Sequence, residues 1–168
     1  MSVDIAVIDY GMGNLRSVSK AIEHVAPAMS VVVTSDPAVI AAAGRVVFPG
    51  QGAAPDCLRE IDARGLRQVI VDAAHSKPFL GICMGMQVLF EHSEEGDTDC
   101  LGILPGTVQR FPAEAMVDAE GNKLKVPHMG WNNVHQAAPH PLWAGIEEGE
   151  RFYFVHSYFV QPTSPDVI

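Results

Sequence analysis

The chain has 168 residues, of which 48% are hydrophobic, and this suits one domain with a single core. Its formal net charge of −9 argues against binding to nucleic acid or to an anionic membrane, because both need a basic face. Three cysteines without a Cys-x-x-Cys pair, and the lack of a leader or a long apolar run, predict a soluble cytoplasmic protein without disulfides, metal or cofactor.

The first half of the chain alternates short apolar strands with helices. Residues 4–9 predict a strand, and Asn14 stands where a helix N-cap belongs, before apolar residues that recur at helical spacing: Leu15, Val18, Ile22 and Val25. Further strands are predicted at 31–33, 45–48 and 79–82, and helices at 36–43, 54–61 and 66–74. Strands that are apolar throughout imply a sheet covered on both faces. The expected fold is therefore α/β: a flavodoxin-like, doubly wound, mostly parallel sheet flanked by helices.

The second half of the chain has fewer helices. One helix is predicted to run from residue 83 to about Phe90, and the acidic, polar residues 93–99 predict a solvated loop. Short or hairpin-like strands are predicted around Val108, Val126 and Val134 and over residues 152–160. Because no linker-like tract intervenes, we expect a smaller antiparallel addition to the same domain.

The most informative segment is Pro78–Gln87, an apolar strand that passes through Gly-x-Cys-x-Gly into a helical stretch. This pattern is typical of a nucleophile elbow. Gly81 and Gly85 allow strand and helix backbones to pass closely, so that a strained turn presents Cys83 outward. The N–H groups of the first helical turn are expected to stabilise its thiolate. A buried structural cysteine is the alternative, and the two glycines favour the nucleophile.

A thiol that attacks a carbonyl needs donors for the developing oxyanion. The backbone N–H of Met84, directly after the nucleophile, is the first candidate. The second is Gln51, since the loop 48–52 follows a predicted strand and would emerge at the same sheet edge as the elbow. Gly50 and Gly52 would let the Gln51 peptide rotate toward the oxyanion. An ordinary β-to-α turn explains the loop equally well.

Several segments together resemble the class I glutamine amidotransferases, and among them the glutaminase subunits of imidazole glycerol phosphate synthase: residues 8–18, 48–52, 78–87, 125–132 and 152–159. The resemblance covers nearly the whole chain and implies one such domain over residues 1–168. It implies that Cys83 attacks the side-chain amide of glutamine, that ammonia leaves, and that a glutamyl thioester is hydrolysed to glutamate.

The same resemblance implies a set of residues that hold glutamine: Gly52, Gln87, His156, Ser157 and Tyr158. Two of them have plain structural alternatives. Gln87 lies one turn into the elbow helix, where it would face solvent, and Tyr158 belongs to an aromatic-rich strand, where it would pack in the core.

The resemblance also implies a partner, a cyclase subunit with a (β/α)8 barrel. In this heterodimer the ammonia is used to make imidazole glycerol phosphate and AICAR in histidine biosynthesis. Residues implied at the docking surface are Asn14, His128, Met129, Trp131 and Tyr153. Core packing is the alternative for Trp131, and helix capping is the alternative for Asn14.

The chain departs from the family pattern in its proton relay. The family's histidine base and its carboxylate lie in a Phe-His-Pro-Glu segment that this chain lacks, since Leu142 follows His140-Pro141 where the glutamate should stand. We therefore expect a domain truncated after Ile168, inactive alone and with an exposed sheet edge.

The chain also departs from the family pattern at Gln51, which replaces the usual aliphatic residue. A donor that acts through its backbone N–H tolerates this change. Two alternatives stay open: a cysteine hydrolase of another class, and a non-catalytic regulatory or binding subunit.

Overall fold

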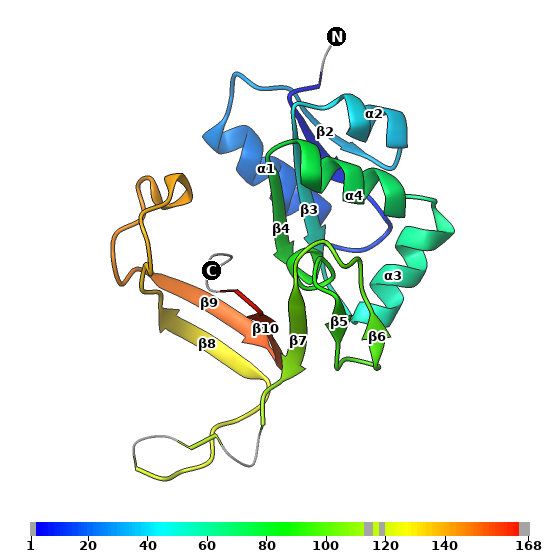
Figure 1. Cartoon of the computed structure of the whole chain (residues 1–168). Coiled ribbons are helices and arrows are strands. Elements are labelled where there is room, and N and C mark those ends of the chain that lie inside the picture. Colours follow the sequence, from blue (N-terminus) through cyan, green and yellow to red (C-terminus); the bar gives the residue numbers. More distant parts are fainter. Residues whose placement is uncertain (1–2, 113–115, 118–119, 165–168) are drawn as a thin grey trace.

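A computed structural model describes residues 3–112, 116–117 and 120–164, so the expected truncation point at Ile168 lies outside the described residues (Figure 1). Parallel strands form a sheet in the order β2-β1-β3-β4. Their bounds are β1 Ile5–Ile8, β2 Val31–Thr34, β3 Arg45–Gly50 and β4 Phe79–Cys83. This order is that of flavodoxin-like sheets, and the predicted parallel α/β architecture is confirmed.

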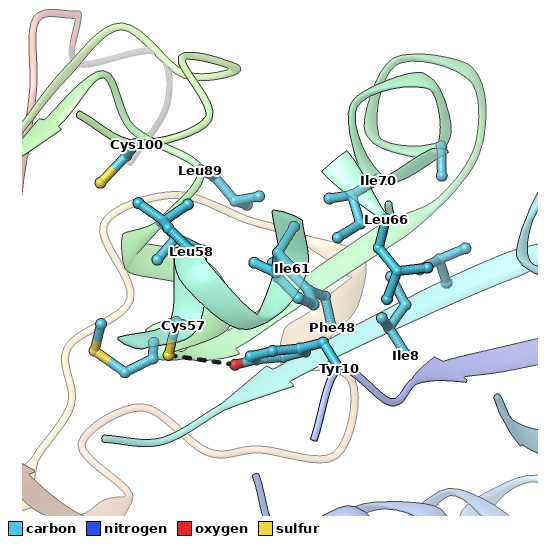
Figure 2. Packing of buried hydrophobic residues seen from close by; sticks show 14 of the residues in the cluster. Ile8, Tyr10, Phe48, Cys57, Leu58, Ile61, Leu66, Ile70, Leu89 and Cys100 are labelled. Atoms are coloured by element: carbon cyan, nitrogen blue, oxygen red, sulfur yellow. Dashed lines mark hydrogen bonds between the residues drawn. The ribbon is translucent and has the colours of Figure 1, made fainter. Parts of the chain in front are cut away.

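Helices cover both faces of this sheet. Helix α1 (Leu15–Val25) packs on one face against Ile5, Val7 and Val47. The opposite face carries α2 (Pro37–Ala42), α3 (Ala54–Ala63) and α4 (Arg67–Ser76). Figure 2 shows this second core, in which side chains of α3 and α4 meet those of β1 and β3: Leu58, Ile61, Ile70, Ile8 and Phe48. Because successive strand residues point to opposite faces, the central strands β1 and β3 supply both cores.

Helix α1 begins as the sequence predicts. The side-chain Oδ1 of Asn14 accepts a hydrogen bond from the N–H of Ser17 at 3.3 Å, so the predicted N-cap is confirmed. Leu15, Val18 and Ile22 pack on the sheet. Val25 was expected on the same face but is 78% exposed, because it is the last residue of the helix and lies beyond the core.

The second half of the chain forms two further sheets. The four-stranded sheet has the order β10-β7-β5-β6, with a parallel β5–β7 pair between two antiparallel pairs. Strands β8 and β9 form a separate antiparallel sheet, seen at the lower left of Figure 1. The bounds are β5 His92–Ser93, β6 Thr98–Asp99, β7 Gly106–Arg110, β8 His128–Asn133, β9 Arg151–His156 and β10 Tyr158–Pro162, with a 3-10 turn at Pro141–Trp143. The predicted antiparallel addition is confirmed.

Several expected boundaries in this half are wrong. The elbow helix α5 (Met84–Gln87) stops before Phe90, because residues 101–104 donate to the carbonyl groups of residues 88–90 and turn the chain aside. The expected loop 93–99 instead contains most of the short β5–β6 hairpin. Val126 and Val134 lie just outside β8, and the expected strand 152–160 is broken at Ser157. Among the described residues, no helix is long and apolar enough to cross a bilayer.

Strand β4 is not covered on both faces, contrary to the prediction. Leu80 is 40% exposed and Ile82 is 38% exposed. Leu80 pairs in register with Val47, which faces α1, so both exposed residues lie on the α1 side of the sheet. Helix α1 packs on β1 and β3 and leaves the outer strand open. This gives the described sheet an apolar edge.

We expect this edge to drive self-association. The double variant Leu80→Thr/Ile82→Thr places strand-forming, β-branched residues at both positions but removes apolar surface, so the weight-average mass should depend less on protein concentration in sedimentation velocity. Val33→Thr is the matched control, since Val33 is 39% exposed on β2 at the other edge. If Val33→Thr reduced the concentration dependence of the mass equally, association would be due to exposed apolar surface in general, and a specific role of β4 would be contradicted.

Candidate active site

Cys83 occupies a strained turn between β4 and α5. Its φ of 55° and ψ of −118° place it where non-glycine residues are rarely found, and among the described residues only Asp97 is another non-glycine residue with positive φ. The turn predicted at the elbow is therefore present. Helix α5 has only four residues, so one helical turn of N–H groups follows the cysteine rather than the longer helix that we expected.

Two glycines allow the elbow to cross strand β3. A Cβ added to Gly85 would lie 1.8 Å from the carbonyl oxygen of Phe48, which no rearrangement of side chains relieves. A Cβ added to Gly50 would lie 2.6 Å from the backbone nitrogen of Gly85. In the register of the sheet, Gly50 pairs with Cys83 itself. The close crossing therefore sets the cysteine beside the loop that follows β3.

The three cysteines differ in environment. Cys83 is exposed, whereas Cys57 and Cys100 are buried. Burial raises the pKa of the Cys57 thiol, and it raises the pKa of the Cys100 thiol to about 11. Cys57 and Cys100 are therefore protonated structural residues at neutral pH, and Cys83 is the one cysteine that is open to solvent.

A cavity of about 330 Å³ opens in front of Cys83. All the residues predicted as nucleophile, oxyanion donors or glutamine ligands line it: Gln51, Gly52, Cys83, Met84, Gln87, His156, Ser157 and Tyr158. They come from three places, the end of β3, the elbow, and the junction of β9 with β10. Residues that are far apart in the sequence thus meet around one space of a size that suits a small ligand.

Gln87 faces this cavity from α5 and is not a solvent-facing residue. It is only 7% exposed, and its Oε1 is the one buried side-chain polar atom without a hydrogen-bond partner among the described residues. A buried amide oxygen without a partner is costly in a folded protein. The burial of Gln87 Oε1 is explained if a ligand in the cavity donates a hydrogen bond to it.

Glu95 also lines the cavity, although no sequence pattern predicted it there. Its carboxylate Oε2 accepts the backbone N–H of Ala54 at the start of α3, at 2.8 Å. Its own backbone is held twice, since its N–H donates to Ser93 Oγ at 3.2 Å and its carbonyl accepts from Thr98 Oγ1 at 2.8 Å. Glu95 stands in a run of acidic residues, and nothing local in the sequence separates it from its neighbours.

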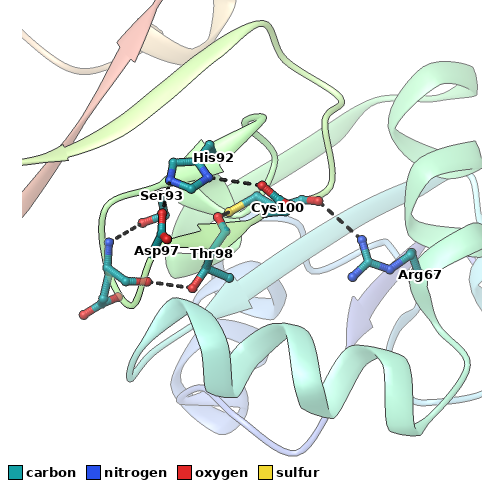
Figure 3. A network of polar contacts seen from close by, with 8 residues as sticks. Arg67, His92, Ser93, Asp97, Thr98 and Cys100 are labelled. Carbon is teal, nitrogen blue, oxygen red and sulfur yellow. Dashed lines mark hydrogen bonds and ion pairs between the residues drawn. The ribbon is translucent and has the colours of Figure 1, made fainter.

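The turn that carries Glu95 is fixed by further contacts, and Figure 3 shows those around His92 and the one between Arg67 and Cys100. The His92 ring lies between the carboxylates of Asp97 and Asp99, at 3.2 Å from each. Arg67 of α4 forms a two-pronged pair with Asp62 through Nε and Nη2, and its third nitrogen, Nη1, donates to the Cys100 carbonyl at 3.4 Å. The β5–β6 hairpin is therefore attached to the helical layer, so the Glu95 carboxylate has a defined place.

A buried side-chain pair holds the loop after β3 (Figure 2). The thiol of Cys57 donates to the Gln51 carbonyl at 3.4 Å, and the Tyr10 hydroxyl donates to Cys57 Sγ at 3.6 Å. The pKa of Tyr10 is raised by burial, so its hydroxyl keeps its proton. The peptide that joins Gln51 to Gly52 is anchored in this way. Any rotation that aims the Gln51 N–H at an oxyanion must therefore occur in the preceding peptide, at Gly50.

No histidine among the described residues offers a free nitrogen beside Cys83. His156 lines the cavity, but its Nδ1 lies 2.9 Å from the Tyr158 carbonyl oxygen and its Nε2 lies 3.1 Å from Nδ1 of His128. His140 accepts the N–H of Leu142 and lines a different hollow, among residues at the N-terminal ends of β3 and β4. The described residues therefore place the predicted nucleophile and oxyanion donors together without a histidine base beside them.

The residues predicted to dock a partner fall into separate groups. Met129, Trp131 and Tyr153 lie on one face of the β8–β9 hairpin, at 59%, 60% and 57% exposure, and the rings of Trp131 and Tyr153 are in edge contact at 5.6 Å. His128 points to the other face, because side chains alternate along β8. Asn14 caps α1 in the first half of the chain. The structure brings together three of the five.

Comparison with known proteins decides the family. Residues 6–168 match the family described as Glutamine amidotransferase class-I. The chain belongs to this family. It is 85% identical over 168 residues to imidazole glycerol phosphate synthase subunit HisH of Thiobacillus denitrificans, covering all of this chain and 74% of that relative. It is 70% identical over 165 residues to the same subunit of Aromatoleum aromaticum, covering 98% of this chain and 78% of that relative.

Solved structures of amidotransferases share the fold. One glutamine amidotransferase superposes with a TM-score of 0.61 at 11% identity, over 96% of this chain and 75% of the other. A second, from Thermotoga maritima, superposes with a TM-score of 0.59 at 15% identity, over 96% of this chain and 64% of the other. The family match and the high identity to HisH subunits do not favour a cysteine hydrolase of another class.

The crossing at Gly85 yields a stability prediction. Gly85→Ala should lower the free energy of unfolding by at least about 3 kcal/mol, because the new methyl group meets the Phe48 carbonyl. Gly65→Ala is the control: its Cβ would meet nothing within 4 Å, so only its φ of 65° costs energy, about 1 kcal/mol. Urea unfolding measures both. Equal losses would show that the elbow is not tightly packed on β3.

Proposed function

We propose that this amidotransferase is the glutaminase subunit of an imidazole glycerol phosphate synthase in histidine biosynthesis, with Cys83 as its nucleophile. The observation that carries the proposal is the cavity in which an exposed cysteine on an elbow meets a buried, unpartnered amide and a fixed carboxylate. The high identity to HisH subunits over the whole chain supports the same activity. We propose that residues 1–168 form a single amidotransferase domain.

The cavity suits free glutamine as the substrate. The Glu95 carboxylate complements the α-ammonium group of an amino acid, and the buried Oε1 of Gln87 accepts a hydrogen bond from the ligand. Gly52 and residues 156–158 present backbone groups and polar side chains to the rest of the ligand. In this arrangement the side-chain amide of glutamine reaches Cys83, which stands at the elbow end of the same cavity.

The reaction follows from this placement. The Cys83 thiolate attacks the amide carbon, and the N–H groups of Met84 and Gln51 stabilise the oxyanion. When the tetrahedral intermediate collapses, the C–N bond breaks and the nitrogen leaves as ammonia after taking up a proton, which leaves a glutamyl thioester. Water then attacks the thioester, which releases glutamate and restores the thiol. Because no described histidine has a free nitrogen beside Cys83, we propose that the chain alone turns glutamine over slowly.

The ammonia would go to a cyclase subunit, for which we propose a (β/α)8 barrel. The proposed docking surface is the exposed hairpin face of Met129, Trp131, Tyr153 and Val155, since an apolar aromatic patch is typical of a protein interface. Asn14 stays a candidate for the same interface in addition to its capping role. A cytoplasmic location is also proposed, and the three free thiols are consistent with a reducing compartment.

Active-site labelling tests the glutaminase proposal. A diazo-ketone analogue of glutamine should modify Cys83 in the unmodified chain and should not modify Cys83→Ala, as read by intact-protein mass spectrometry. Glu95→Gln should slow the labelling about tenfold, because the ammonium group of the analogue loses its counter-charge. Glu94→Gln is the matched control, since Glu94 does not line the cavity. Efficient hydrolysis of simple esters by Cys83 would contradict the proposal.

Alanine substitution on the hairpin tests the docking surface. Trp131→Ala should weaken the complex with the cyclase subunit by about 2 kcal/mol, or about thirtyfold in Kd, while the unfolding midpoint of the isolated chain stays the same. Phe152→Ala is the control on the other face of the same hairpin. Isothermal titration calorimetry measures the affinities. An unchanged Kd for Trp131→Ala would move the interface elsewhere.

A further inference from the structure

We propose that His128 is a positioning residue of the glutamine cavity: its Nδ1–H holds His156, and His156 in turn holds the bend at residues 156–158 in the cavity wall. The hydrogen-bond chain stands on geometry alone. Its effect on glutamine affinity rests on the function proposed above. The resemblance to the family placed His128 at the partner surface, whereas its side chain lies on the opposite face of the hairpin from Met129 and Trp131.

The bend is where two sheets join. Strand β9 ends at His156, strand β10 begins at Tyr158, and Ser157 between them belongs to neither. Two hydrogen bonds hold this break. The N–H of Phe111 donates to the Ser157 carbonyl at 3.0 Å, and Nδ1 of His156 lies 2.9 Å from the Tyr158 carbonyl oxygen. All three residues of the bend line the cavity, so its shape depends on these bonds.

The contacts of the two imidazole rings determine which nitrogens carry protons. A carbonyl oxygen only accepts, so Nδ1 of His156 must be protonated to bond Tyr158. In a neutral ring, Nε2 of His156 then has a lone pair and accepts. Its neighbour at 3.1 Å is Nδ1 of His128, which must therefore be the donor. Both rings are Nδ1–H tautomers in this arrangement.

Packing keeps the rings in this orientation. His128 lies directly opposite His156 in the β8–β9 register, and its ring stacks on Phe154 at 5.3 Å. Phe111 meets the His156 ring edge-on at 4.9 Å. Rotation of His156 away from the Tyr158 carbonyl would have to displace these neighbours. His128 supplies the one polar contact that this cluster gives to Nε2 of His156.

A pair of amide substitutions separates this role from simple packing. In His128→Asn the side-chain nitrogen takes the place of Nδ1 and still donates, whereas in His128→Gln the amide extends to the place of Nε2. Long-range ¹H–¹⁵N NMR at alkaline pH reads the tautomers. We expect Nδ1–H for both histidines in the unmodified chain and an unchanged His156 tautomer in His128→Asn. In His128→Gln we expect shifted Ser157 and Tyr158 amide signals.

Glutamine affinity gives the functional readout, measured by calorimetry on the full chain. His128→Asn should bind glutamine like the unmodified chain, and His128→Gln should bind it about fivefold to tenfold more weakly, the effect of one hydrogen bond. Thermal unfolding of both variants controls for loss of fold. An Nε2–H tautomer at either histidine in the unmodified chain would overturn the proposal, as would equal behaviour of the two variants.

The same experiments distinguish a failure of the glutaminase function from a failure of the positioning role of His128. If the unmodified chain binds no glutamine, the glutaminase proposal fails, and the tautomers and the amide signals of the bend still decide whether His128 positions it. If glutamine binds and the tautomers are wrong, the positioning role alone fails.

Discussion

The crossing of the elbow over strand β3 is the contact on which the active site depends. Two backbones approach here so closely that a single methyl group on Gly85 would overlap the Phe48 carbonyl. Because of this approach, the end of β3 and Cys83 lie side by side, with Gly50 opposite Cys83 in the sheet register. Gln51 and Gly52, which directly follow β3, therefore line the same cavity as Cys83. The strained φ of Cys83 is maintained by the packing beneath it.

Around this crossing, the rest of the cavity is assembled by elements that do not belong to the parallel sheet. The β5–β6 hairpin brings Glu95 to the start of α3, and the junction of β9 with β10 brings His156 and its neighbours to the opposite wall. Each wall is held by its own polar contacts: the Cys57 and Tyr10 pair below the Gln51 loop, the Ser93 and Thr98 bonds around Glu95, and the two histidines at the bend. Polar groups that are fully engaged in this way make a site rigid enough to orient a small substrate.

Sequence patterns gave the local elements correctly where one physical rule dominates. Apolar runs between turns predicted the parallel strands, the capping side chain predicted where α1 begins, and Gly-x-Cys-x-Gly predicted the elbow. They were wrong where distant residues compete. Helix α5 stops early because residues 101–104 bond to carbonyl groups past its end, and β4 stays open on one face because α1 does not extend over Leu80. Local propensity carries no information on either.

By itself, the sequence determined the elbow at Cys83, the fold class and the family, because a strained turn, alternating elements and signature segments are all written in consecutive residues. The resemblance also predicted most of the residues that line the cavity with Cys83, and only the tertiary structure decided that Glu95 joins them and that His128 contacts His156 in the cavity wall. Glu95 is one of several acidic residues, and His128 is one of seven histidines, until packing gives the first a helix end and the second a histidine partner. Such roles depend on distances between strands that are far apart in the chain, and no spacing of residues along the sequence encodes those distances.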